Sequence, residues 1–145
     1  MSDNFSTSIT INSNPTKVWQ TLTDIEIIPQ WLDDPGMEIE VLTNWQVNTP
    51  IIIKGFHHVK FENKGLVLAF DKERKLSFTH LSSVSKLPDI PESYSMLTFI
   101  LEPIDNTTKM ILNIENFPTE SIRKHLEFYW RTTLFTIKNT VEKWI

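Results

Sequence analysis

The sequence predicts an α+β domain in which an antiparallel sheet packs against a long C-terminal helix. Three observations predict this class. A helix-start signal follows a first short strand, apolar and polar residues alternate through most of the middle of the chain, and residues 119–145 repeat at helical spacing. A run of strands followed by a helix favours an antiparallel sheet over a doubly wound parallel one. At 145 residues, we expect one domain covering residues 1–145.

The N-terminal part predicts one strand and two short helices. Residues 5–11 alternate loosely and are expected to form the strand. Asn14 followed by Pro15 then predicts a helix start, because an Asn side chain accepts a hydrogen bond from a free backbone N–H and Pro fits the first helical position. A second short helix is expected over residues 26–32, stopped by the polar, Pro- and Gly-containing segment 33–36.

The middle of the chain predicts about six strands joined by turns. Turns are expected at Asn48, at residues 71–74 and at Asp105-Asn106, and the proline-containing stretch 82–93 is expected to be the longest loop. Alternating apolar residues predict strands at 38–43, 51–56, 65–70, 75–81, 94–101 and 109–115.

The C-terminal helix is expected to begin after Thr119, which caps it, and to run nearly to Ile145. Phe128 and Phe135 are a heptad apart and fall nearly opposite its apolar stripe, so we expect them to form an exposed patch that could join a homodimer or be covered by another segment. The stripe that must face the sheet consists of Ile122, Leu126, Tyr129, Trp130, Thr133, Leu134, Ile137, Val141 and Trp144.

Composition excludes several classes of function. The net charge is −4, spread without long runs of one sign, so no basic face is present for nucleic acid or for an anionic membrane. The chain has no Cys, which excludes disulfides, thiolate metal sites and cysteine nucleophiles. No signal-peptide pattern and no stretch of about 20 apolar residues is found, so we expect a cytoplasmic protein.

Five segments in order resemble one known family. They are INSNPTKVW (11–19), PQW (29–31), GLVLAFD with RKLSFTH (65–71 and 74–80), LTFILEP (97–103) and YWRTTL (129–134). With these segments the sequence is similar to the START-like, or birch-pollen-allergen-like, helix-grip superfamily (SRPBCC), in the branch named after the activator of the heat-shock-protein-90 ATPase. It departs from the pattern at the turn before the third strand, where Asn48 replaces the usual glycine.

The resemblance implies a curved sheet of about six to seven strands wrapped around the C-terminal helix, with a cavity between them. It also implies a small hydrophobic or amphipathic ligand in that cavity and no cofactor. The alternative is a chaperone-associated interaction module that acts through its outer surface. Some relatives cyclise polyketides, so a cyclase- or hydrolase-like enzyme is a third alternative by analogy only.

The generous aromatic content, 11% of the chain, indicates either a solid aromatic core or a lined cavity. His80 shares a strand face with Leu76 and Phe78 and is expected to point inward with them, as a hydrogen-bonded rim residue, a ligand-orienting group or a general base. The candidate cavity residues are Trp31, Phe56, Phe78, His80, Tyr94, Phe99, Leu126, Tyr129, Trp130, Thr133 and Leu134.

Other chemistry-bearing residues form no recognisable motif. His57 and His58 are adjacent on an expected strand and point to opposite faces, so they cannot share a metal ion. His125 falls beside the apolar stripe and is expected to meet solvent. The Asp33-Asp34 pair is interpreted as a solvated helix stop, and no catalytic triad or phosphate-binding glycine loop can be assembled.

Overall fold

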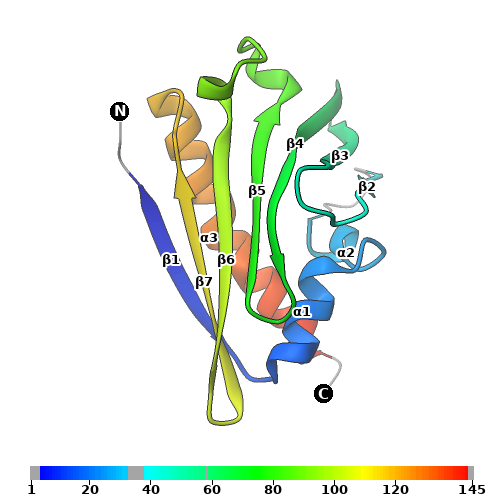
Figure 1. Ribbon diagram of the computed structural model, residues 1–145, viewed down its shortest axis with the longest axis vertical. Helices are drawn as coiled ribbons and strands as arrows, with labels where there is room; N and C mark the ends of the chain where they lie inside the picture. Colours follow the sequence, from blue (N-terminus) through cyan, green and yellow to red (C-terminus); the bar gives the residue numbers. More distant parts are fainter. Residues whose placement is uncertain (1–3, 33–37, 58, 144–145) are drawn as a thin grey trace.

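The computed structural model describes residues 4–32, 38–57 and 59–143. A seven-stranded antiparallel sheet has the order β1-β7-β6-β5-β4-β3-β2, and α3 lies across one face of it (Figure 1). The elements are β1 Phe5–Ile11, α1 Pro15–Thr23, α2 Ile28–Leu32, β2 Glu40–Leu42, β3 Pro50–His57, β4 Val59–Asp71, β5 Lys75–Ser82, the short 3₁₀ turns Ser83–Ser85 and Pro91–Ser93, β6 Ser95–Ile104, β7 Thr107–Glu115 and α3 Glu120–Glu142. The predicted fold class is confirmed.

The helix starts follow the predicted capping chemistry. The Asn14 side chain accepts a hydrogen bond from the Lys17 backbone N–H at 2.9 Å, and Pro15 is the first residue of α1. The Thr119 hydroxyl accepts from the Ile122 N–H at 3.1 Å and caps α3. Helix α2 begins at Ile28, two residues later than predicted, because the chain first forms a turn in which Ile27 N–H donates to the Asp24 carbonyl.

The core lies between the sheet and the C-terminal half of α3. Alternate residues of β6 and β7 are buried there, as the period-two pattern requires. They belong to one cluster with the buried stripe of α3; its central members are Leu97, Phe99, Leu101, Met110, Leu112, Ile114, Leu134, Ile137 and Val141.

Strand β4 is longer than predicted and makes a close contact with β5. It begins at Val59, six residues before the expected start at Gly65. A Cβ atom on Gly65 would lie 1.8 Å from the Thr79 carbonyl oxygen, so the two backbones approach closely enough that only glycine fits. The register shifts just beyond, between Val67 and Ala69. This irregularity accompanies the curvature by which β4 and β3 turn away from the central strands and leave space above α3.

Candidate functional site: a cavity between the sheet and α3

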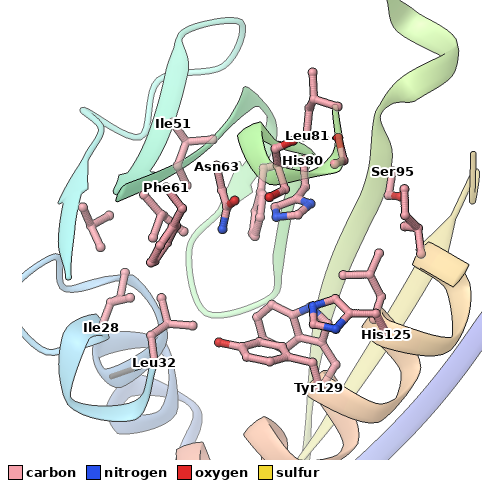
Figure 2. A pocket seen from close by; sticks show the side chains of 18 of the residues that line it. Ile28, Leu32, Ile51, Phe61, Asn63, His80, Leu81, Ser95, His125 and Tyr129 are labelled. Atoms are coloured by element: carbon pink, nitrogen blue, oxygen red, sulfur yellow. Dashed lines mark hydrogen bonds between the residues drawn. The ribbon is translucent and has the colours of Figure 1, made fainter. Parts of the chain in front are cut away.

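A cavity of about 490 Å³ lies between the curved sheet and the N-terminal half of α3, with α2 closing one side. Its walls come from α2, from strands β2 to β6 and from α3 (Figure 2). The volume falls within the range of small-molecule sites, about 300–1,000 Å³. The space is therefore large enough for a small molecule.

One end of the cavity is apolar. Ile28 and Leu32 of α2 face Ile51 of β3 and Phe61 of β4 across it (Figure 2). Ile51 and Phe61 point inward because alternate residues of a strand share one face. This end offers hydrocarbon surface from two layers of the fold.

Aromatic rings form the wall nearest the core. Trp130 of α3 packs edge-on against Phe99 of β6 and against Tyr129, with ring centroids 5.6 and 5.3 Å apart. Trp31 of α2 lies against Trp130 at 6.4 Å, and its indole N–H donates to the Thr21 carbonyl at 2.9 Å. Because this N–H is already bonded within the chain, the Trp31 ring is held in place and presents apolar surface to the cavity.

Polar side chains gather at the other end. Asn63 of β4, His80 of β5 and Ser95 of β6 lie on the sheet side, and His125 of α3 lies across from them (Figure 2). His80 and Ser95 are directly opposite each other in the β5–β6 ladder. The cavity is thus divided into an apolar end and a polar end.

His80 is an uncharged group at neutral pH. Removal from water and, to a smaller extent, the neighbouring His125 together lower the pKa of its imidazole to about 4. The hydrogen bond expected of a structural histidine is not found between the His80 ring and the described residues. His80 can therefore donate and accept one hydrogen bond each toward the cavity, as a neutral imidazole.

The structure brings seven of the eleven predicted cavity residues together. The lining includes Trp31, Phe78, His80, Phe99, Leu126, Tyr129 and Trp130.

Four predicted residues lie elsewhere. Phe56 is on the opposite face of β3 from Ile51 and is 48% exposed. The Tyr94 hydroxyl donates to Asp89 at 2.6 Å, which holds the ring on the loop outside the cavity. Thr133 and Leu134 are buried one turn beyond the cavity, in the core under α3.

Sequence reasoning missed most of the polar end. Asn63 lies in the part of β4 that was not predicted as strand, and Ser95 was not considered. His125 has an exposed side chain, as predicted, yet it also lines the cavity mouth. Ser95 could have been found from register, because a β5–β6 hairpin that places His80 inward places its cross-strand partner inward too.

The other residues considered for catalysis or metal binding form no such site in the described part of the chain. Asp33, Asp34 and His58 lie outside the described residues, as does the side chain of His57. Among the residues that are described, no group of three or more His, Cys, Asp or Glu could hold a metal ion. No helix in the same ranges is long and apolar enough to cross a membrane.

Comparison with known proteins identifies the family. The family model of the activator of Hsp90 ATPase homolog 1-like proteins matches residues 12–142. The chain belongs to this family. No curated protein matches it.

Solved structures of the same fold come from several bacteria. A protein from Cytophaga hutchinsonii is 29% identical with a TM-score of 0.80, covering 97% of this chain and 94% of that one. A protein from Chromobacterium violaceum is 17% identical with a TM-score of 0.81 and 96% of each chain covered. An Aha1 dimer from Colwellia psychrerythraea is 19% identical with a TM-score of 0.76, covering 97% and 96%. The latter two likenesses show the fold alone.

Proposed function

We propose that this family member is a binding protein for a small hydrophobic or amphipathic molecule held between the sheet and α3. The observation that carries the proposal is the cavity of about 490 Å³, with hydrocarbon and aromatic walls and a few polar groups at one end. Binding sites for small molecules have this composition. Affinity would come from buried apolar area, at roughly 25 cal/mol per Å².

The test is to fill the cavity from one strand. Ile53 of β3 lines the cavity, whereas Ile52 is on the other face of the same strand. We expect the neutral fluorescent probe Nile red to bind the wild type and the Ile52→Trp control. The Ile53→Trp variant should fold but lose most of this binding, because the indole occupies the space.

Two results would contradict the proposal: a wild type that neither binds Nile red nor melts at higher temperature with it, or equal binding by both variants. If Nile red binds as expected, native mass spectrometry of protein purified from cells identifies the natural ligand by its mass.

The second candidate function is a chaperone-associated interaction module, which family membership supports through the family's description. Such a module would act through its outer surface. Stimulation of an Hsp90 ATPase by both the wild type and Ile53→Trp would support it, because that activity does not depend on an open cavity. Absence of stimulation by the wild type would count against it.

We further propose that the exposed face of α3 joins two copies of the chain. Phe128 and Phe135 are 75% and 63% exposed, and the related Colwellia structure is a dimer. Two large rings in line form an apolar patch that association would bury. Sedimentation should show a dimer that Phe128→Glu converts to a monomer. The control Ile25→Glu changes an exposed residue outside α3 and should leave the dimer intact. A monomeric wild type at high concentration would overturn the idea.

A further inference from the structure

The polar end of the cavity contains side chains that make no hydrogen bond to the described residues. We define the polar cluster as Asn63, His80, Ser95 and His125. Among the described residues no hydrogen bond is made by the amide of Asn63, the Ser95 hydroxyl or either imidazole. Ser95 lines the cavity and is only 1% exposed, so it lies deep in the wall of the polar end.

Two other serines of the same wall, Ser82 and Ser85, do make hydrogen bonds within the chain. The Ser82 hydroxyl accepts from the Val84 backbone N–H at 3.3 Å, and the Ser85 hydroxyl donates to the Ser82 carbonyl at 2.7 Å. These two serines shape the loop after β5. The polar cluster has no such structural use. Among the described residues no buried side-chain nitrogen or oxygen atom lacks a hydrogen-bond partner, so the polar atoms of this cluster reach the open space of the cavity. Water, or a polar group of a molecule that enters the cavity, can bond to them there.

The cavity wall also determines what charge that group can carry. The described lining residues include no Asp, Glu, Lys or Arg. His80 is neutral at pH 7 because burial lowers its pKa to about 4. A carboxylate or ammonium placed here would lose part of its hydration without gaining an opposite charge from the described residues, which costs several kcal/mol. A neutral polar group would lose little, since imidazole, amide and hydroxyl can each donate or accept.

We propose that the ligand is an uncharged amphiphile, whose hydroxyl, carbonyl or amide group bonds to the polar cluster while its hydrocarbon part fills the apolar end. This inference rests on the proposed function, since it assigns the chemical class of the molecule bound there. The division of the cavity in Figure 2 gives the orientation: the ligand's polar group lies between β5 and the first half of α3, and its apolar body points toward α2.

The experiment compares three molecules of one shape. Naphthalene, 2-naphthol and 2-naphthoate share a flat bicyclic body and differ only in the polar group. Their affinities for the wild type are measured by displacement of Nile red. The pH is 8, because an unperturbed imidazole is neutral at that pH. We expect 2-naphthol to bind several-fold more tightly than naphthalene, and 2-naphthoate to bind at least tenfold more weakly than 2-naphthol.

Variants of the polar cluster then test which residues cause the preference for 2-naphthol. Ser95→Ala, with or without His80→Phe, should reduce the ratio of 2-naphthol affinity to naphthalene affinity by about two- to tenfold per lost hydrogen bond. Ser121→Ala, at the exposed margin of the cavity, should retain the full preference. Circular dichroism and the melting temperature check that each variant folds.

The outcomes separate this inference from the proposed function. If Nile red and all three molecules fail to bind, the proposed function is wrong and this inference falls with it. If they bind but 2-naphthoate matches or exceeds 2-naphthol, a cavity ligand exists and its uncharged class is wrong. If 2-naphthol and naphthalene bind equally, or the preference survives in Ser95→Ala with His80→Phe, the polar cluster does not bind the ligand's polar group.

Discussion

Mild acid should destabilise this protein through His80. The pKa of this imidazole is about 4 in the folded chain, against an ordinary value of 6.5, because burial disfavours the charged form. Between these two values the unfolded chain binds a proton that the folded chain does not. The stability is therefore complete above pH 6.5 and falls as the pH is lowered from 6.5 to about 4.

The size of the effect follows from the difference in pKa. Each pKa unit corresponds to about 1.4 kcal/mol, so the interval from 6.5 to about 4 corresponds to about 3 kcal/mol in total. Between pH 7 and pH 5 the loss is about 2 kcal/mol. Because His80 faces the cavity and keeps part of its surface, this figure is an upper value for the folded state.

The loss of stability is measured by urea denaturation at pH 7 and at pH 5, with tryptophan fluorescence as the signal of unfolding. The His80→Gln variant cannot titrate in this range and should lose about 2 kcal/mol less than the wild type. The carboxyl groups whose pKa is lowered by ion pairs, such as Glu120 beside Arg123, are common to both proteins and cancel in the comparison. His125→Gln should keep most of the pH dependence, because the charge on His125 is the smaller cause. Equal losses in the wild type and His80→Gln would refute the reasoning.

Three further predictions concern the fold, each measured as the free energy of unfolding in urea. Gly65→Ala should destabilise by at least about 1–3 kcal/mol, because the new methyl group meets the Thr79 carbonyl oxygen; an unchanged midpoint would contradict the close contact. Leu112→Ala should lower the free energy of unfolding by about 2–5 kcal/mol, since Leu112 has no exposed surface. The loss should exceed that of Ile111→Ala, because Ile111 lies on the half-buried face of the same strand. Thr119→Ala should cost about 1 kcal/mol by removing the α3 cap, and Thr119→Ser should restore stability.

The parts of the fold that could be predicted depend on local chemistry. Asn14 and Thr119 cap their helices as predicted because a capping side chain bonds within three residues of itself. The left-handed residues Asn48 and Asp105, with φ of 69° and 54°, mark predicted turns because Asn and Asp tolerate that conformation. Such signals do not require knowledge of the rest of the chain.

The first half of β4 was missed for a reason that concerns the site. Residues 59–64 alternate as a strand should, with Lys60, Glu62 and Lys64 on the outer face and Phe61 and Asn63 lining the cavity. Asn63 replaces the apolar residue that a solid core would require. A polar residue at an inward-facing position weakens the apolar alternation by which a strand is predicted.

Helix α3 shows why the cavity residues could be predicted only in part. The helical period gives the face on which a residue lies, and Leu126, Trp130 and Leu134 share the buried face as predicted. It does not give the depth of the space beneath each turn. Leu126 and Leu134 are about 12 Å apart along the axis, at 1.5 Å per residue. The first lies over the cavity where β3 and β4 curve away, and the second lies over the solid core of β6 and β7. That difference is set by the curvature of a sheet whose close contact at Gly65 and register shift at Val67 are tertiary features. Among residues on the buried face of α3, the position along the helix therefore decides which ones line the cavity.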